Sequence, residues 1–317
     1  MEELYDVIVI GGGCAGLAAA LYAKRYTLKV LVLAKELGGL ITTTHIVENY
    51  PGVLPASGWD MMNLFLKQME LLNVEMNEVA VTAIRRVEEC PDGSCSHVFQ
   101  VDADGQLYLT KTVVYATGTK RRELNAPGEK EYYGKGVSYC ATCDGALFKG
   151  KRLAVVGGGD SAAKEALLLS EYGSHVWVIA RSKLRAEPIN LQRIQNNPKV
   201  DIIEDNEILS IEGDGNKVTA VRLKKPYNAN DKLEIGGLFI EIGHLPANDL
   251  ARAVGVSLND HGEIKIDRES KTNIPGFFAA GDCTDTPWKQ AIVSASEGSQ
   301  AANSSYEYIT NEYVQNK

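Results

Sequence analysis

The fold is decided by the stretch Asp6-Val-Ile-Val-Ile-Gly-Gly-Gly-Cys-Ala-Gly16. Its apolar, β-branched run ends in glycines, and the good helix formers Leu-Ala-Ala-Ala-Leu-Tyr-Ala follow at positions 17–23. This order predicts a strand, a tight turn and a helix, which together make the first half of a βαβ unit. A second strand is expected at residues 29–34, so the chain opens with the core of an α/β domain.

The same pattern returns at Arg152-Leu-Ala-Val-Val-Gly-Gly-Gly-Asp-Ser-Ala162, with a helix expected at 163–172 and a strand at 175–180. Gly157 stands 146 positions after Gly11, which is too long a period for a solenoid. The repeat therefore predicts two separate nucleotide-binding domains. Residues 81–114 and 201–239 alternate apolar and polar side chains around turns, and we expect an antiparallel excursion in each.

The bulk properties agree with a two-domain chain that acts on small molecules or proteins. There are 317 residues, 44% of them hydrophobic, with a formal charge of −8. Such an acidic surface disfavours nucleic acid and anionic membranes as partners, although it also simply favours solubility. No apolar run approaches the roughly 18 residues that a spanning helix needs, and no basic segment opens the chain. A cytoplasmic location is the default expectation.

The first glycine-rich turn has the spacing of a dinucleotide site. Gly11 allows a tight turn, Gly13 lets the backbone approach a pyrophosphate, and Gly16 lets helix and strand pack closely. The motif lies between an expected strand and an expected helix, which is its confirming context; a plain tight turn is the alternative. Glu36, after the second strand, has the position of a ribose ligand, but a solvated loop charge explains it equally well.

The second turn is a variant of the same design, with Gly157, Gly159 and Ala162. Its second strand leads to Arg181 and Arg185, with no carboxylate placed to accept a ribose 2′-hydroxyl. Guanidinium groups suit a 2′-phosphate, because their planar fork matches phosphate oxygens. This favours NADPH over NADH. The alternative is that both arginines only lie on an exposed loop.

The sequence Cys140-Ala-Thr-Cys143-Asp144 directly precedes the second turn. A Cys-x-x-Cys pair near a helix start favours a reactive thiolate. Asp144 has the position of a proton shuttle for a departing thiolate, or of a simple helix cap.

A zinc site would need four ligands, and Cys90 and Cys95 are the only candidates for a second pair. Their spacing is looser than usual and no histidine partner is near, so no metal is expected. They are interpreted as ordinary thiols, with a disulfide between them as the alternative. Cys14 and Cys283 are expected to be small buried packing residues.

Together these pieces resemble the low-molecular-weight thioredoxin reductases across almost the entire chain. The matching segments are residues 10–18 (FAD turn), 38–44 and 47–52 (along the flavin), 116–118 (strand end before the crossover), 136–145 (redox signature), 157–162 (NADPH turn), and 276–282 with 289–291 (second FAD strip). The redox signature is the most specific of them.

The resemblance implies two Rossmann-like, three-layer ββα domains, one inserted in the other and joined by a two-stranded hinge near 117–120 and 243–246. The FAD domain would comprise 1–116 and 245–317, and the NAD(P)H domain 117–244. The resemblance implies FAD contacts at Gly11, Gly13, Cys14, Ala15, Gly16, Glu36, Gly39, Leu40, Thr43, Asn49, Thr117, Gly118, Gly281, Asp282, Lys289, Gln290 and Ala291. It implies NADPH contacts at Gly157, Gly159, Asp160, Ser161, Ala162, Arg181 and Arg185.

The activity implied is that of a homodimeric thioredoxin-disulfide reductase whose domains rotate against one another. NADPH reduces FAD, and FAD reduces the Cys140–Cys143 disulfide, with Cys143 expected nearest the flavin. Cys140 then attacks oxidised thioredoxin, Cys143 resolves the mixed disulfide, and Asp144 is the general acid–base.

Departures from the family pattern keep alternatives open. Ala180, Ser182 and Lys164 replace family residues around the NADPH phosphate, which leaves NADH, reduced ferredoxin or a deazaflavin as donors. Leu40 and Lys289 replace family residues along the FAD. The alternatives are a related flavoprotein with another donor or another disulfide partner, and a flavin-binding sensor that uses no pyridine nucleotide.

Overall fold

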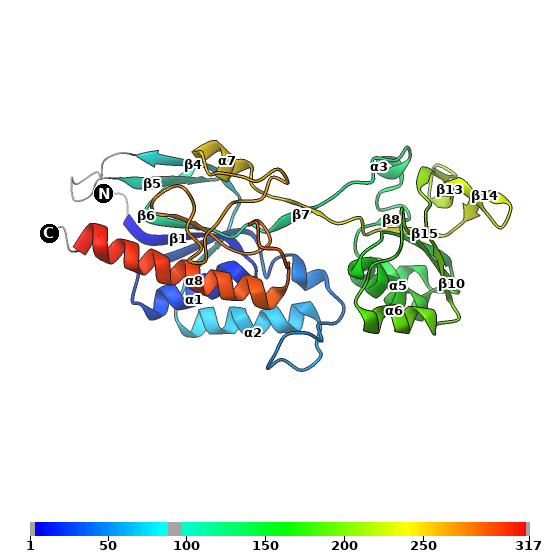
Figure 1. Cartoon of the computed structure of the whole chain (residues 1–317), viewed down its shortest axis with the longest axis horizontal. Helices are drawn as coiled ribbons and strands as arrows, with labels where there is room; N and C mark the ends of the chain where they lie inside the picture. Colours follow the sequence, from blue (N-terminus) through cyan, green and yellow to red (C-terminus); the bar gives the residue numbers. More distant parts are fainter. Residues whose placement is uncertain (1–3, 88–96, 315–317) are drawn as a thin grey trace. The chain divides into compact units, whose positions relative to one another are not determined.

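The computed structural model describes residues 4–87 and 97–314, and these form two compact units. The first unit combines residues up to Lys120 with those from Pro246 onward, and the second runs from Arg121 to Leu245. Between them the chain passes through two short strands, β7 (Thr119–Arg121) and β16 (His244–Pro246), which pair with one another (Figure 1). The predicted α/β class with two Rossmann-like units, one inserted in the other, is confirmed.

The first unit is built on one sheet with strand order β3-β2-β1-β6-β5-β4, and β17 pairs with β6. The strands are β1 (Leu4–Gly12), β2 (Val30–Leu37), β3 (Glu75–Glu78), β4 (Val81–Val87), β5 (Val98–Ala103), β6 (Gln106–Tyr115) and β17 (Phe277–Ala279). Pairing is parallel from β3 to β6 and to β17, and antiparallel through β5 and β4. The expected antiparallel excursion at 81–114 is therefore present.

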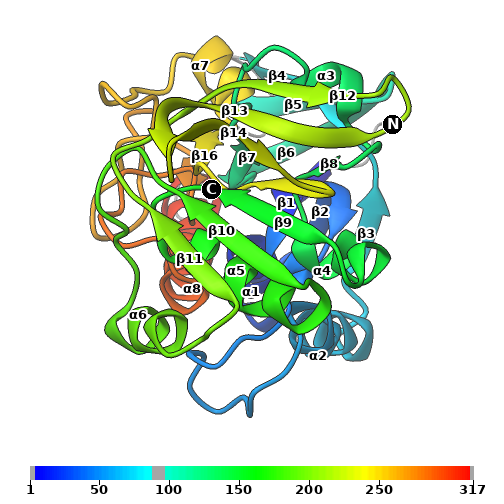
Figure 2. The same ribbon diagram turned by 90° about the vertical axis from the view of Figure 1, so that its right-hand side faces the viewer.

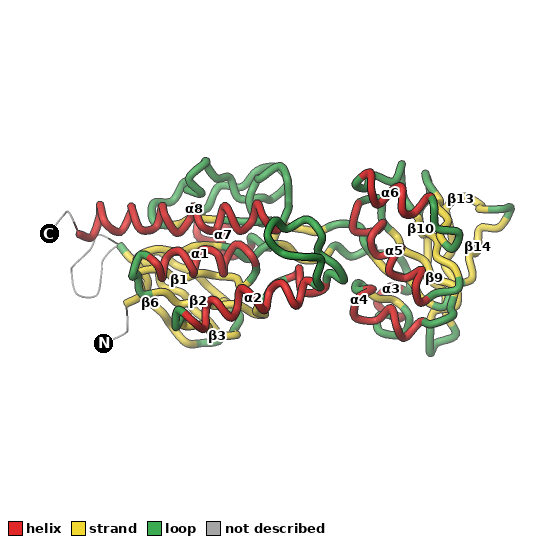
Figure 3. The backbone as a smooth tube through the Cα atoms, turned by 90° about the horizontal axis from the view of Figure 1, so that it is seen from below, coloured by secondary structure: helices red, strands yellow, loops and turns green. Residues whose placement is uncertain are grey.

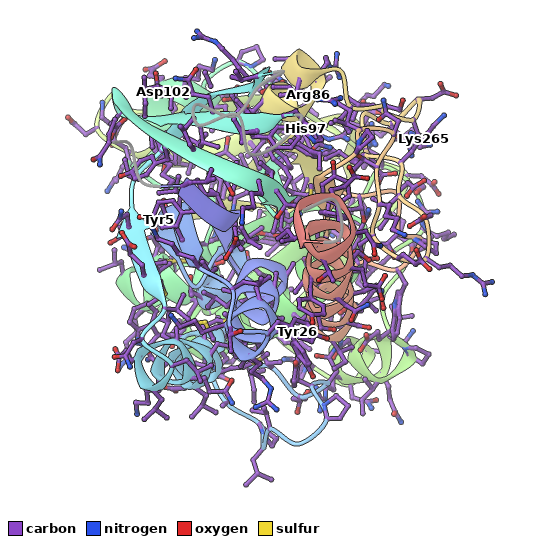
Figure 4. The ribbon with its side chains drawn as sticks, turned by 90° about the vertical axis from the view of Figure 1, so that its left-hand side faces the viewer. Tyr5, Tyr26, Arg86, His97, Asp102 and Lys265 are labelled. Atoms are coloured by element: carbon purple, nitrogen blue, oxygen red, sulfur yellow. A yellow bond between two sulfur atoms is a disulfide. The ribbon has the colours of Figure 1, made fainter. Side chains whose placement is uncertain are left out.

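Alternation along β1 supplies both faces of this sheet. Val7 and Val9 belong to the apolar cluster under the helices, whereas Ile8 and Ile10 belong to the cluster on the opposite face. Helices α1 (Cys14–Arg25), α2 (Gly58–Leu71) and α8 (Ala291–Ile309) cover the first face, as Figure 3 shows, and α7 (Asp249–Val254) lies over the other. Figure 4 labels Tyr26 at the end of α1, where its ring stacks on Tyr306 of α8.

The second unit has the same plan. Its parallel sheet has the order β11-β10-β9-β15-β8, and a separate antiparallel sheet has the order β12-β13-β14 (Figure 2). The strands are β8 (Val137–Ser138), β9 (Arg152–Val156), β10 (His175–Ile179), β11 (Val200–Ile203), β12 (Ile208–Gly213), β13 (Val218–Tyr227), β14 (Asn230–Glu234) and β15 (Gly237–Ile240). The helical elements are α3 (Glu129–Tyr132), α4 (Ala141–Asp144), the short 3-10 helix η2 (Gly145–Phe148), α5 (Asp160–Tyr172) and α6 (Pro188–Gln195).

The three layers of this unit follow from alternation on β9. Leu153 and Val155 pack in the cluster formed with α5, and Ala154 and Val156 pack in the cluster shared with the antiparallel sheet. The prediction of an antiparallel excursion over the whole of 201–239 was wrong at its ends. Strands β11 and β15 join the parallel sheet, because they are short, largely apolar runs whose sequence does not specify a pairing direction.

Within residues 4–87 and 97–314, we find no helix with both the length and the apolar character needed to cross a bilayer.

Candidate active site

The first glycine turn connects β1 to α1 at the carboxyl edge of the sheet. Gly11 has φ +118°, and a Cβ there would lie 2.1 Å from the Ala116 carbonyl oxygen, so only glycine fits beside β6. A Cβ at Gly16 would lie 1.9 Å from the Gly11 carbonyl oxygen. Gly13 differs, because its nearest neighbour would be the Gly39 Cα at 3.9 Å. The backbone at Gly13 is thus open to a ligand, where α1 begins without a side-chain cap.

The ends of β17 and β6 meet this turn from the other side. Gly281, with φ +84°, would place a Cβ 2.9 Å from the Ala15 Cβ, so it packs directly on α1. Its N–H donates to Glu297 across 2.8 Å, and Asp282 accepts from the Ser294 hydroxyl across 3.1 Å. Ligands of open α/β sheets bind beyond the carboxyl ends of strands, so Asp282 stands where a dinucleotide would lie.

Two segments far apart in the sequence meet near the start of α8. Asn49 donates to Gln290 across 3.1 Å, and Lys289 bridges to Glu263 at 3.1 Å and donates to the carbonyl of Thr284. Gln290 is the N-cap of α8, and Ala291 is the first residue of that helix. This contact joins two segments that the sequence assigned separately to the flavin.

The other residues predicted to contact FAD lie at the same carboxyl edge. After β2, Glu36 is exposed, Gly39 (φ +68°) packs against Gly13, and the Thr43 hydroxyl donates to the Leu40 carbonyl across 2.8 Å. After β6, the Thr117 hydroxyl donates to the Ala247 carbonyl across 2.9 Å, and Gly118 (φ +62°) has open space at its Cβ position.

Cys14 has a packing environment. Its thiol is buried and donates to the Met62 sulfur across 3.5 Å. Burial, followed by the negative charge of Asp282, raises the pKa of this thiol to about 12. Cys283 is also buried, with its pKa raised to about 12 mainly by burial. Neither residue is an accessible thiolate at neutral pH. Cys90 and Cys95 lie outside the described residues.

The second glycine turn repeats the geometry of the first. A Cβ at Gly157 would lie 2.1 Å from the Glu241 carbonyl oxygen, whereas Gly159 has nothing within 4 Å of that position. Ala162 is buried one turn into α5, and Ser161 is exposed beside it. Gly159 is the N-cap of α5 and supplies no side-chain cap, so the first N–H groups of the helix have the geometry that favours a phosphate.

Asp160 has an internal role in addition to its place in the turn. Its carboxylate accepts from the Asn190 amide at 2.9 Å and from the Glu187 N–H at 2.8 Å, and pairs with Lys164 at 2.8 Å. Burial opposes ionisation, but these donors outweigh it and hold the pKa of Asp160 below its ordinary value. Arg181 and Arg185 are exposed beyond β10, and the Arg185 N–H donates to the Gly158 carbonyl across 2.8 Å.

The redox pair is a disulfide between Cys140 and Cys143. Cys140 is the N-cap of α4, and its sulfur accepts from the Cys143 N–H across 3.1 Å. Asp144 ends α4, and its carboxylate makes no capping bond to η2; it accepts from the Ser138 hydroxyl at 2.6 Å. The same hydroxyl accepts from the Cys140 N–H at 3.0 Å. Ser138, which sequence reasoning missed, thus links the acid to the pair.

The segment that leads into the disulfide is held by two charged side chains. Glu129 is 2% exposed, and its carboxylate accepts from the Leu124 N–H at 2.8 Å and from the Tyr139 hydroxyl. Arg121 donates to the Tyr139 carbonyl. Burial, followed by contact with Glu129, raises the pKa of Tyr139 well above its usual range, so the phenol remains a donor. No sequence motif predicts these contacts of Glu129 and Arg121, because they form only when the chain folds.

No group of three or more His, Cys, Asp or Glu side chains in the described part of the chain is arranged to hold a metal ion. The two cysteines of the redox pair are bonded to one another. The arrangement can therefore accept two electrons by opening one S–S bond.

Comparison with known proteins agrees with this geometry. The family described as pyridine nucleotide-disulphide oxidoreductase matches residues 5–298. Thioredoxin reductase from Listeria innocua serovar 6a is 37% identical over 97% of this chain and 95% of its own length. A component of alkyl hydroperoxide reductase from Xanthomonas campestris pv. phaseoli is also 37% identical, but the chain spans only 58% of that protein. The crystal structure of Lactococcus lactis thioredoxin reductase (FR conformation) has a TM-score of 0.90 at 36% identity and covers 97% of this chain and 99% of its own. The chain therefore belongs to the pyridine nucleotide-disulphide oxidoreductase family, within which its sequence and fold match the thioredoxin reductases.

Proposed function

We propose that this chain is a thioredoxin-disulfide reductase, which passes electrons from NADPH through FAD to the Cys140–Cys143 disulfide and then to oxidised thioredoxin. The observation that carries the proposal is the disulfide at the start of α4, on a unit with one dinucleotide turn, in a chain that has a second such turn. The full-length similarity to a thioredoxin reductase supports the same substrate.

The residues at both turns fit the two nucleotides. At Gly13 and Gly159 the backbone is open where a side chain would otherwise fill the phosphate position, and no side chain caps either helix. We assign FAD to the first turn, with Asp282 toward its ribityl chain, and NADPH to the second, with Arg181 and Arg185 toward the 2′-phosphate. When bound, FAD supplies the two-electron chemistry that connects a nicotinamide to a disulfide.

The chain's own residues then carry out thiol–disulfide exchange. Reduction of the pair adds two electrons and breaks its S–S bond. The Cys140 thiolate attacks one sulfur of the thioredoxin disulfide and forms a mixed disulfide, and the other sulfur leaves as a thiolate. Cys143 attacks Cys140, which restores the internal disulfide and releases dithiol thioredoxin. Asp144, oriented by Ser138, delivers the proton that the departing thiolate takes up.

The assembly and location belong to the same proposal. We infer a homodimer, as in the family that the chain resembles. Leu71 on α2 is 82% exposed and Tyr22 on α1 is 42% exposed, and both line one surface hollow. A second copy would shield this apolar surface. Light scattering is expected to give about twice 34.4 kDa. A reducing compartment, the cytoplasm, suits the free thiols Cys14 and Cys283.

The test is NADPH-dependent thiol release from oxidised thioredoxin. Cys143→Ser is expected to keep its bound flavin and to lose this activity, because the mixed disulfide can no longer be resolved internally. Cys283→Ala is the matched control, since it removes a free thiol outside the pair and should retain the activity. Undiminished thiol release by Cys143→Ser would refute the proposal.

A second candidate is a reductase of the same type with another donor or another disulfide partner. The similarity to a component of alkyl hydroperoxide reductase favours a different partner, and the pairing of Lys164 with Asp160 favours a different donor, because that cation is already engaged. Anaerobic titration with NADPH and then NADH identifies the donor by bleaching of the flavin. No bleaching by either would leave reduced ferredoxin or a deazaflavin as the donor, or a flavin-binding sensor.

A further inference from the structure

Two carboxyl side chains of the second unit lie near α4, the short helix that carries the Cys140–Cys143 disulfide. Glu165 lies on α5, and Glu241 directly follows β15. The N–H of Ala141, the first residue of α4, donates to Oε1 of Glu165 across 3.0 Å. The two carboxyl groups lie close enough together that each alters the pKa of the other. The chain therefore places a pair of acids one backbone hydrogen bond away from the segment that carries the disulfide.

This carboxyl pair requires a proton. Oε2 of Glu165 is buried, and no donor among the described residues bonds to it. Ionised carboxylates only accept hydrogen bonds, so a bond between two of them needs one proton. A proton on Glu241 supplies the donor that Oε2 of Glu165 lacks. One shared proton thus explains both why Oε2 of Glu165 lacks another donor and why a second carboxyl group lies beside it.

The charges that face the pair also favour its binding one proton. Burial, followed by the negative charge of Glu165, raises the pKa of Glu241 to about 8, although Arg121 acts in the opposite direction. Burial also raises the pKa of Glu165, against the Ala141 N–H and Arg121. Arg121 is the cation among the described residues that acts on both acids. One proton leaves the pair with a single negative charge, which this guanidinium balances.

We propose that Glu165 and Glu241 act as a positioning pair that shares one proton, holds the start of α4 through Ala141, and couples the dithiol–disulfide equilibrium of Cys140 and Cys143 to loss of that proton. The inference rests on the proposed redox role of the two cysteines. Their reduction takes two electrons from the donor and up to two protons from solvent, and the shared proton stays on the pair.

The coupling has a definite sign. Above the pH at which the pair loses its proton, a second negative charge lies near α4, and Arg121, the one cation among the described residues that acts on both acids, balances only the first. The reduced form carries a thiolate at alkaline pH and the disulfide carries no charge, so this second charge disfavours reduction. Glu241→Gln keeps the donor to Glu165 and cannot ionise. The variant therefore fixes the protonated arrangement at every pH.

The experiment equilibrates the flavin-containing protein with dithiothreitol redox buffers from pH 6.5 to 9.5 and counts labelled Cys140 and Cys143 thiols by mass spectrometry. The measured quantity is the equilibrium constant for reduction of the Cys140–Cys143 disulfide by dithiothreitol. The pH dependence of the buffer is common to all variants, so it cancels when the constant of a variant is divided by that of the wild type. For Glu241→Gln this ratio should be near one at pH 6.5 and rise about threefold to tenfold by pH 9.5. Glu171→Gln, at an exposed position on the same helix, should stay near one throughout.

A ratio for Glu241→Gln that is independent of pH would overturn the proposal, because a merely structural role shifts the equilibrium equally at all pH values. Glu165→Gln is the second variant, and it should show the same alkaline rise, since the remaining acid faces Arg121 without a second carboxylate. If Glu241→Gln fails to fold, a flat ratio for Glu165→Gln overturns the proposal instead. A wild-type pair that never exchanges with dithiothreitol would overturn the proposed function and this inference with it.

Discussion

Replacing Gly13 with alanine should weaken FAD binding without changing the stability of the first turn. At Gly13 the backbone has φ −84° and ψ −168°, which any residue adopts, and a Cβ would meet nothing closer than 3.9 Å. At Gly16, two residues into α1, a Cβ would lie 1.9 Å from a carbonyl oxygen. Alanine therefore fits at the first position and clashes at the second. We expect opposite consequences from two substitutions three residues apart.

The size of the effect at Gly13 follows from two opposing contributions to stability. Alanine is a poorer N-cap than glycine, which costs about 0.5 kcal/mol, whereas the smaller entropy of the unfolded chain gains about 0.4–1 kcal/mol. The free energy of unfolding should thus change by no more than about 0.5 kcal/mol. The added methyl group stands where a pyrophosphate approaches the backbone. FAD affinity should fall about tenfold to a hundredfold, which corresponds to about 1.4–2.8 kcal/mol.

The assay combines urea unfolding of the FAD-free protein with titration of FAD by quenching of flavin fluorescence. Gly159→Ala is the matched control, because its Cβ position is equally open but lies at the other turn. That variant should bind FAD normally and lose affinity for NADPH. Gly16→Ala should lose stability by about 3 kcal/mol or fail to fold. Wild-type FAD affinity in Gly13→Ala, or an equal loss in Gly159→Ala, would refute the assignment.

Three further changes test the second unit. Glu129→Gln should lower the free energy of unfolding by about 1–3 kcal/mol, measured with urea, because one of the two buried acceptor oxygens becomes an amide donor that faces another donor, the Asn125 N–H or the Tyr139 hydroxyl; an unchanged midpoint would contradict this role. Burial raises the pKa of Glu241 from 4.5 to about 8, so the folded chain holds a proton that the unfolded chain releases. Stability should therefore decline by about 5 kcal/mol as pH rises from 4.5 to 8, and about 3 kcal/mol of that decline lies above pH 6. Urea unfolding at pH 6 and pH 9 should show this decline in the wild type and not in Glu241→Gln. Ser138→Ala should slow thioredoxin reduction about threefold to tenfold without changing flavin reduction in stopped flow, because Asp144 loses its orienting donor; equal slowing of both steps would count against it.

The sequence predicted what depends on neighbouring residues. The two glycine turns and the Cys140–Cys143 pair were recognisable because strand, turn and helix signals stand next to one another. Strand β11 was misassigned because a short apolar run pairs equally well in either direction. The pairing of Glu165 with Glu241 was invisible, since the two residues are far apart in the chain and meet only after α5 packs beside β15. Ser138 lies inside the recognised signature, but its hydrogen bonds depend on the turn before α4.

The pairing of β7 with β16 has a consequence for how such a chain is assembled. Within the second unit the Arg122 N–H donates to the Gly243 carbonyl across 3.1 Å, and within the first unit the Ala247 N–H donates to the Gly118 carbonyl across 3.1 Å. In each unit the two chain positions at which the other unit is joined therefore lie next to one another. Residues 121–245 are suited to excision and separate expression, and a short linker from Lys120 to Pro246 would rejoin what remains. Because its two ends lie together, an inserted unit of this kind can be exchanged as one piece without rebuilding the core of the unit that holds it.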